Sequence, residues 1–211
     1  MPHINDVRST LCRFANLLHT QGLVAGLDGN VSARLEDGLF LATPTASHLG
    51  VIEPQDLLIV TLDGEVQGDG RVTSEWAMHA ACYRNRPDIG AVFHAHPIHV
   101  VARTLDGREM DPAVLPEVLV CVGPAPIVPY ATTGSATLAD AVGEAIRNAD
   151  AAILERHGAV TVGRTAQQAC ARMEALEHAA KIFDATVRPP TPLPADEQAR
   201  LAVIRDQLGS V

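Results

Sequence analysis

Aromatic residues are scarce in this chain, and so is positive charge. Phenylalanine, tyrosine and tryptophan make up 3% of the 211 residues, and 16 lysines and arginines face 25 aspartates and glutamates, a formal net charge of −9. Proteins that bind single-stranded nucleic acid need aromatic side chains on which bases stack, and nucleic acid and acidic membrane surfaces attract positive charge. We therefore expect no nucleic acid and no membrane as partners, whereas a small anionic substrate stays compatible with a local positive pocket.

The chain also lacks the signatures of disulfide scaffolds, secretion and membrane insertion. Its cysteines show no Cys-x-x-Cys spacing, so we expect them to be reduced and mostly buried: Cys12, Cys82, Cys121 and Cys170. Residues 1–6 contain no basic stretch followed by an apolar run, and no segment approaches the roughly 18 uninterrupted apolar residues of a membrane span. The expected location is cytoplasmic.

A length of 211 residues suits one domain with a substantial aliphatic core. Hydrophobic periodicity predicts helices over 6–20, 74–85, 97–105, 137–148 and 165–187, and strands over 31–35, 39–42, 57–61, 151–155 and 159–162, with a further strand ending at His96. Residues 106–135 are rich in proline and are expected to form loops. We assign residues 1–188 to the domain, and residues 189–211 to a proline-rich linker and a C-terminal helix over about 195–208. Short strands first and interleaved helices later indicate an α/β fold with a mostly antiparallel sheet covered by helices.

Three histidines stand at the ends of apolar runs. His94 and His96 end the run that begins at Ile89, and His157 follows the run 151–155. Side chains two residues apart on a strand share a face and lie roughly 6–7 Å apart, so two such imidazoles can bind one metal ion. Three histidines with an open fourth position form a common catalytic zinc site. The alternative is three buried structural histidines, each of which would need another partner or cost about 1–3 kcal/mol.

A second group of polar residues lies in turns and at a helix start. Glu75 begins the helix predicted from 74, after Thr73 and Ser74. A carboxylate is favoured there by the helix dipole, which is the structural interpretation, but hydroxyls and free N–H groups at a helix start also bind anions. Residues 29–30 and 43–45 form similar small, polar turns.

The order of these motifs resembles the class II aldolase/adducin family, and most of all its L-fuculose-phosphate aldolases. The series consists of Gly-Asn-Val-Ser-Ala-Arg at 29–34, Thr-Pro-Thr at 43–45, Thr-Ser-Glu-Trp at 73–76, His-Ala-His-Pro at 94–97, Pro-Tyr-Ala at 129–131 and Arg-His-Gly at 156–158. The resemblance covers about residues 7–185.

The resemblance implies a role for each matching residue. His94, His96 and His157 would bind Zn²⁺, or another divalent ion such as Mn²⁺ or Co²⁺, and Glu75 would be the catalytic carboxylate, either as a base or as a ligand of the resting metal. The substrate phosphate would be bound by the residues that match the family's phosphate pocket, namely Asn30, Thr45, Thr73 and Ser74. The family's fold is a three-layer structure with an antiparallel sheet between helix layers. Its members form homotetramers with active sites at subunit interfaces.

The function that the resemblance implies first is a zinc-dependent aldolase. It would cleave a ketose 1-phosphate into dihydroxyacetone phosphate and an aldehyde through a metal-stabilised enediolate. Two departures bear on the substrate: Ala46 replaces the usual glycine after Thr-Pro-Thr, and residues 117–120 lack the tyrosine that fuculose-phosphate aldolases carry after a Leu/Ile-Pro pair. An apolar wall there suits a less polar aldehyde, so the candidate substrates are a 5-deoxy- or methylthio-pentulose 1-phosphate and L-fuculose 1-phosphate.

Two alternatives stay open at this point. The first is a sibling reaction on a related sugar phosphate: decarboxylation, dehydration or epimerisation, although pentulose-phosphate 4-epimerases typically carry aspartate where this chain has Glu75. The second is a non-catalytic, adducin-like structural module. The three histidines and Glu75 argue against such a module.

Overall fold

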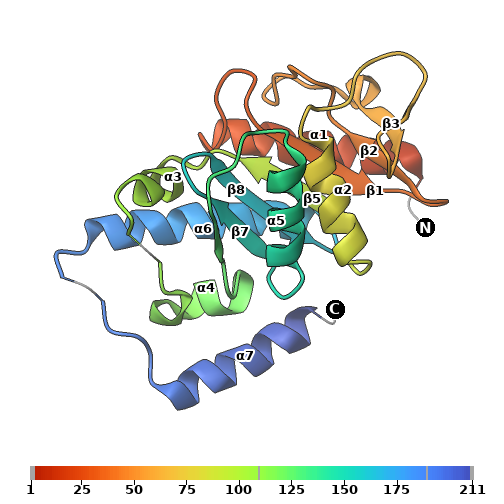
Figure 1. Ribbon diagram of the computed structural model, residues 1–211. Coiled ribbons are helices and arrows are strands. Elements are labelled where there is room, and N and C mark those ends of the chain that lie inside the picture. Colours follow the sequence, from red (N-terminus) through yellow and green to blue (C-terminus); the bar gives the residue numbers. More distant parts are fainter. Residues whose placement is uncertain (1–2, 109, 189, 210–211) are drawn as a thin grey trace.

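The computed structural model describes residues 3–108, 110–188 and 190–209. Its strands are β1 (Asn30–Arg34), β2 (Leu39–Ala42), β3 (Leu58–Thr61), β4 (Val66–Gln67), β5 (Ala91–Ala95), β6 (Ile127–Val128), β7 (Ala151–Leu154) and β8 (Gly158–Gly163). Within the described residues they form one eight-stranded sheet in the order β4-β3-β2-β1-β5-β8-β7-β6, and every pairing except β6 with β7 is antiparallel. The predicted α/β fold with a mostly antiparallel sheet is confirmed (Figure 1).

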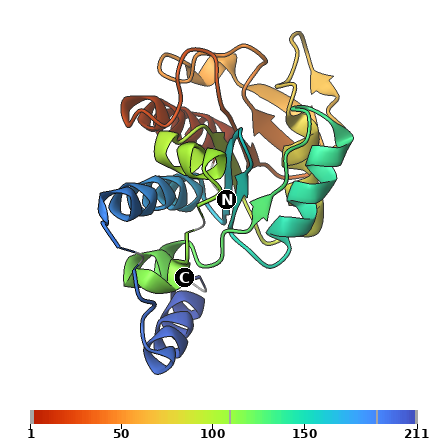
Figure 2. The same cartoon turned by 60° about the vertical axis from the view of Figure 1, so that its left-hand side comes forward.

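Helices cover both faces of this sheet. They are α1 (Ile4–Thr20), α2 (Trp76–Asn85), α3 (Ile98–Leu105), α4 (Pro116–Cys121), α5 (Ala136–Ile146), α6 (Ala166–Ala185) and α7 (Ala195–Gly209), with short 3₁₀ turns η1 (Pro54–Asp56) and η2 (Pro112–Val114). Figure 2 shows α1, α3 and α6 on one side of the sheet and α5 on the other side. Helix α2 packs against α5. The three-layer arrangement is therefore present.

The central strand β5 explains why its sequence is an unbroken apolar run. Phe93 belongs to the buried cluster on the side of α1 and α6, together with Leu11 and Met173, whereas Val92 belongs to the cluster on the side of α2 and α5. Because both faces of β5 are covered, all five of its residues are buried. The strand that carries His94 is thus held rigidly in the middle of the molecule.

The proline-rich segment 106–135 is more regular than expected. It contains α4 and the two-residue strand β6. Pro116 is the first residue of α4, a position where its missing N–H costs nothing and its fixed φ suits a helix. Proline content alone therefore hid a short helix.

The C-terminal helix α7 packs on α4, at the end of the molecule away from α1 and β3 (Figure 1). Pro189, the first residue of the expected linker, lies outside the described residues, as do residues 1–2, 109 and 210–211. The division at 188/189 stays a prediction. Of the four cysteines, all free, Cys121 is half-buried and the others are buried. In the described part of the chain, no helix combines the length and apolar character that a membrane crossing needs.

Candidate metal centre and active site

Two strand ends bring the three predicted histidines together. His94 is the fourth residue of β5 and His96 follows that strand directly, whereas His157 ends the tight turn between β7 and β8. β8 lies beside β5, with Ala95 opposite Ala159, so the turn lies against the end of β5. The ring centroids of the three pairs lie 4.7–5.0 Å apart, and each imidazole offers a nitrogen within 4.8 Å of the others.

Glycine is required at position 158 because of this close approach. A Cβ atom there would lie 2.8 Å from His96 Cδ2 and closer still to the Ala95 carbonyl oxygen. Any larger residue would therefore displace the end of β5 and the two histidines on it. The Arg-His-Gly motif thus has a steric basis.

Neighbouring acceptors orient two of the rings. The Nδ1 atom of His94 lies 3.0 Å from the Ala159 carbonyl oxygen, which can only accept, so Nδ1 carries the proton. The Nδ1 atom of His96 lies 3.4 Å from Oδ2 of Asp28. A proton on each Nδ1 leaves each Nε2 as a free ligand atom, which is how outer partners prepare histidines for a metal ion.

Glu75 completes the cluster from the start of α2. Its Oε2 lies 3.1 Å from His94 Nε2, and its Oε1 lies 3.5 Å from His157 Nε2. Burial disfavours the charged carboxylate, but the neighbouring His94 imidazole and the hydrogen bond that the Asn30 amide donates outweigh burial and hold the pKa of Glu75 well below its usual range. Glu75 is therefore an anion pointing at the histidines.

The donor set fits a divalent cation. His94 Nε2 and His96 Nε2 lie 3.1 Å apart, and two lone pairs at that distance, beside a carboxylate, repel unless a positive charge lies between them. Among the described residues, Glu75 Oε1 and His157 Nδ1 are buried atoms without a hydrogen-bond partner. Burial and the neighbouring His94 lower the pKa of His157 to about 4, so its imidazole is neutral at pH 7, as a ligand must be.

The segments predicted to bind phosphate also lie together. A bridge between Pro44 and Val72 joins the turn 43–45 to the approach to α2, and the Thr45 N–H donates to the Arg71 carbonyl at 2.9 Å. Thr45 and Ser74 are exposed and Thr73 is buried. Phosphate binding by these residues stays a prediction.

Ala46 and Asn30 modify this picture. Ala46 has φ 56°, so the turn keeps the left-handed backbone that glycine would supply. Asn30 is buried, pairs with His94 across β1 and β5, and donates from Nδ2 to Glu75 Oε2 at 2.9 Å. Its side chain is thus directed at Glu75, and a phosphate contact for it stays a prediction as well.

Two polar residues at the site were missed by sequence reasoning. Neither Asp28 nor His79 belongs to the motifs from which the site is predicted. The structure places Asp28 beside His96 and buries His79 completely in hydrogen bonds to Asn30 and Ser32. The i, i+4 spacing of Glu75 and His79 on one helix is the signal that could have found His79.

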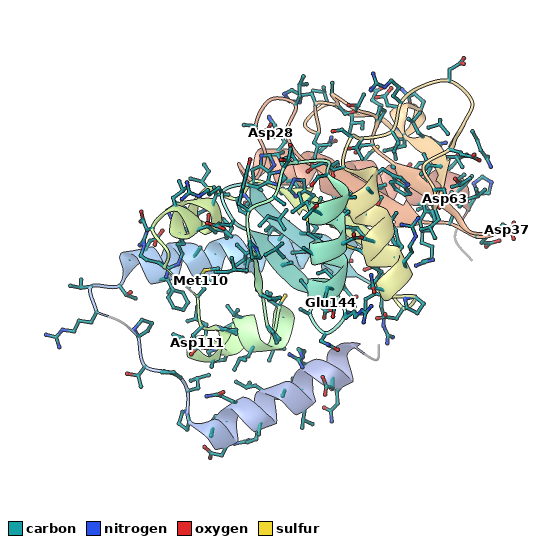
Figure 3. The ribbon with its side chains drawn as sticks, in the orientation of Figure 1. Asp28, Asp37, Asp63, Met110, Asp111 and Glu144 are labelled. Carbon is teal, nitrogen blue, oxygen red and sulfur yellow. The ribbon has the colours of Figure 1, made fainter. Side chains whose placement is uncertain are left out.

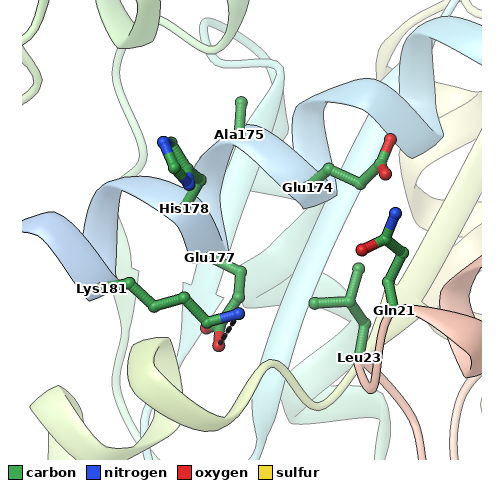
Figure 4. A pocket seen from close by; sticks show the side chains of 7 residues that line it. All are labelled: Gln21, Leu23, Glu174, Ala175, Glu177, His178 and Lys181. Carbon is green, nitrogen blue, oxygen red and sulfur yellow. Dashed lines mark ion pairs between the residues drawn. The ribbon is translucent and has the colours of Figure 1, made fainter.

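A groove of about 400 Å³ between α6 and the segment that follows α1 contains none of these residues (Figure 4). Its most buried charged side chain, Glu177, pairs with Lys181 and accepts hydrogen bonds from the backbone N–H groups of His99 and Val100. Glu177 therefore stabilises the start of α3, directly after the His-Ala-His-Pro segment. We interpret this groove as structural support for the histidine strand.

Replacing Asp28 with alanine is expected to weaken divalent-metal binding by about 10-fold, since outer partners of metal-binding histidines typically contribute 10–100-fold. Asp28→Asn should have a smaller effect, because it keeps an acceptor. The affinity is measured by competition with a chromophoric chelator. Asp63→Asn is the control, because Asp63 pairs with Arg84 in a distant part of the molecule (Figure 3). Equal affinities for Asp28→Ala and wild type would exclude the role of Asp28.

Comparison with known proteins places the chain among relatives of known kind. The family model described as "Class II Aldolase and Adducin N-terminal domain" matches residues 9–183. The chain is 37% identical over 201 residues to a 3-oxo-tetronate 4-phosphate decarboxylase of Escherichia coli O6:H1, which covers 93% of this chain and 95% of the relative. It is 34% identical over 170 residues to an L-fuculose phosphate aldolase of Methanococcus vannielii, and the match covers 81% of this chain and 91% of that relative. The crystal structure of YgbL from Escherichia coli superposes on this chain with a TM-score of 0.88 at 35% sequence identity. The superposition covers 94% of this chain and 99% of YgbL.

Proposed function

Because the chain belongs to the class II aldolase and adducin N-terminal domain family, we propose that it is a metal-dependent carbon–carbon lyase that decarboxylates a 3-oxo sugar acid phosphate, with 3-oxo-tetronate 4-phosphate as the substrate to test. The observation that carries this proposal is the convergence of three imidazoles and the Glu75 carboxylate at the end of β5. The identity to decarboxylases over nearly the whole chain supports the choice of reaction. The aldolase reaction expected from the motifs becomes the second candidate.

The two reactions pass through the same intermediate. In 3-oxo-tetronate 4-phosphate the C1–C2 bond breaks, its electron pair forms a C2–C3 enediolate, CO₂ leaves and a proton is delivered to C2. The product is dihydroxyacetone phosphate. In the aldolase reaction the C3–C4 bond of a ketose 1-phosphate breaks, and the same enediolate forms while an aldehyde leaves. One site can therefore serve either reaction, and the group that leaves distinguishes them.

The positions of the tyrosines in this chain support decarboxylation over aldol cleavage. An aldehyde that forms by bond cleavage needs an acid–base group at its oxygen, whereas CO₂ departs without one. The chain has only two tyrosines. Tyr83 is buried and bonded to Ser32, and Tyr130 is exposed, with its backbone N–H bonded to Glu155. The segment 117–120, where the aldolases carry their tyrosine, forms part of α4.

The residues divide the chemical work. His94, His96 and His157 would hold the metal, for which we propose Zn²⁺ with Mn²⁺ or Co²⁺ as replacements. When bound, such an ion supplies Lewis acidity toward the substrate carbonyl. Glu75 lies beside the histidines with Oε1 free of hydrogen bonds to described residues, so it is placed to move the proton at C2. Thr73 and Ser74 directly precede α2, and Thr45 is hydrogen-bonded to Arg71 on the approach to that helix, where a substrate phosphate is favoured.

We also propose that the site is completed in a homotetramer. Three large side chains are exposed in the single chain, at 59% for Leu27, 67% for Ile98 and 62% for Tyr130. Leu27 and Ile98 lie within two residues of Asp28 and His96, and the Tyr130 backbone N–H donates to Glu155, two residues before His157. Apolar side chains gathered around a polar site are typical of surfaces that another chain covers.

The proposed reaction is tested by following both products. Zinc-loaded protein should release CO₂ and dihydroxyacetone phosphate in equal amounts from 3-oxo-tetronate 4-phosphate, and little triose phosphate from L-fuculose 1-phosphate. Because 3-oxo acids lose CO₂ spontaneously, chelated protein and buffer serve as blanks at each time point. Triose phosphate with an aldehyde and without CO₂ would establish the aldolase instead. Neither product from folded, metal-loaded protein would contradict both candidates.

A further inference from the structure

A row of buried polar side chains runs from Glu75 into the core between β1 and α2. Glu75 Oε2 lies 2.9 Å from Asn30 Nδ2, and Asn30 Oδ1 lies 2.6 Å from His79 Nε2. His79 Nδ1 lies 2.7 Å from Ser32 Oγ, which lies 2.8 Å from the Tyr83 hydroxyl. All five residues are buried. We call these five residues the Glu75–Tyr83 chain.

Two simple spacings build this chain. Asn30 and Ser32 are two apart on β1 and share its face toward α2, whereas Glu75, His79 and Tyr83 are four apart and share one face of α2 and the turn before it. Side chains from β1 and from the α2 segment alternate along the interface between these two elements. Each side chain is therefore hydrogen-bonded to the next one on the opposite element. The arrangement is therefore encoded in the sequence, although no single residue reveals it.

The donors in this chain all point toward Glu75. A carboxylate only accepts, so Asn30 must present its Nδ2–H to Glu75 and its Oδ1 to His79. Asn30 Oδ1 also only accepts, which requires a proton on His79 Nε2. Burial lowers the pKa of His79 to about 3, so this imidazole is neutral and its Nδ1 must accept from Ser32. The Ser32 hydroxyl then accepts from the Tyr83 hydroxyl.

We propose that His79 is a positioning residue for Glu75, which holds the Asn30 amide in the orientation that anchors Glu75 Oε2 and leaves Oε1 toward His157. This inference rests on the proposed function, since it gives Glu75 the proton transfer. Oε1 has no hydrogen-bond partner among the described residues, whereas Oε2 is held by Asn30. One oxygen is thus fixed and the other is left for chemistry, an arrangement that favours a well-oriented proton transfer.

The competing interpretation is that these groups merely satisfy one another in the core. Buried polar groups are almost always hydrogen-bonded, and a purely structural chain would show the same distances. A structural role affects stability and leaves turnover of the folded protein unchanged. A positioning role lowers kcat in protein that is folded and carries its full metal complement.

The kinetic test compares His79→Leu and His79→Gln with Met78→Leu, all in zinc-loaded protein. Met78 is buried on the same helix but is not one of the five residues of the Glu75–Tyr83 chain, and its replacement by leucine conserves volume. We expect His79→Leu to lower kcat by about 100-fold, the cost of misplacing a catalytic group by about 1 Å, with KM and metal content close to wild type. His79→Gln keeps an N–H donor and should recover part of that loss. If His79→Leu turns over like Met78→Leu, the proposal is wrong.

A spectroscopic test requires no substrate. ¹⁵N-histidine-labelled wild type should show His79 as the neutral Nε2–H tautomer, with the signal assigned by its loss in His79→Gln. The Nδ1–H tautomer would reverse the direction of the hydrogen bonds that His79 makes with Ser32 and Asn30, and would overturn the proposal. If wild-type protein released neither CO₂ nor an aldehyde, the proposed function would fail, and the tautomer in metal-loaded protein would still decide whether His79 orients Asn30.

Discussion

Glu75→Gln is expected to lower kcat by about 10²–10⁴-fold, the range that a positioned acid–base group contributes. Glutamine has nearly the same shape and can accept from Asn30 with its carbonyl oxygen, but it cannot take up or release a proton. In that orientation an uncharged amide nitrogen replaces the oxygen that faces His157 Nε2 at 3.5 Å. The rate is measured as dihydroxyacetone phosphate formed by zinc-loaded protein at saturating substrate.

The control for this variant must separate the carboxylate from the metal. Zinc content, measured on the same preparation, should equal that of wild type, because His94, His96 and His157 remain. Glu144→Gln removes a carboxylate from the exposed face of α5 and should leave kcat unchanged (Figure 3). A Glu75→Gln protein with full zinc content and wild-type kcat would remove Glu75 from the reaction and shift the proton transfer to another group.

The outline of the fold could be read from the sequence because periodicity reports burial. The unbroken apolar run of β5 indicated a strand covered on both faces, and the stripe of α6 indicated a helix against the sheet. The strands β4 and β6 could not be predicted, because a strand of two residues shows no hydrophobic periodicity. The short helix α4 was hidden by the prolines around it.

The site shows the same division between local and long-range information. The spacing of His94 and His96 predicts a shared strand face, and the family motif adds His157. Asp28 carries no such local signal, and the i, i+4 spacing of Glu75 and His79 does not by itself show what His79 contacts. Asp28 approaches His96 only because β1 pairs with β5 in the register that sets Asn30 opposite His94. Their roles depend on a sheet register that no single segment specifies.

The motifs predict site residues more sharply than they predict a reaction, and for a physical reason. The motifs that identify the family serve the steps that aldolases and decarboxylases share: holding a cation, binding a phosphate and forming an enediolate. The difference lies in how the leaving group is handled, which requires a group at its oxygen in one reaction and none in the other. A missing tyrosine in residues 117–120 is therefore more informative about the reaction than all the motifs present.

His157→Ala is expected to abolish the stabilisation of the protein by zinc. A ligand that binds only the folded state at 100 times its Kd stabilises it by about 2.7 kcal/mol. For a chain of this size that corresponds to a rise in Tm of about 5–10 °C, at roughly 2–4 °C per kcal/mol. His157→Ala leaves two of the three imidazoles, so zinc affinity should fall by more than the roughly 100-fold that outer partners contribute. The zinc-dependent rise in Tm, measured by calorimetry with and without chelator, should then vanish.

The same variant also separates the metal from the fold. His157 Nδ1 is buried without a hydrogen-bond partner among the described residues, so alanine removes an unsatisfied group and should cost the metal-free protein little stability. His178→Ala is the matched control, because His178 is an exposed histidine on α6, and it should keep the full rise in Tm. If His157→Ala kept the rise as well, zinc would bind elsewhere and the His94–His96–His157 cluster would lose its role. If both variants lost it, the change would reflect the removal of any histidine, and the cluster would again be the wrong site.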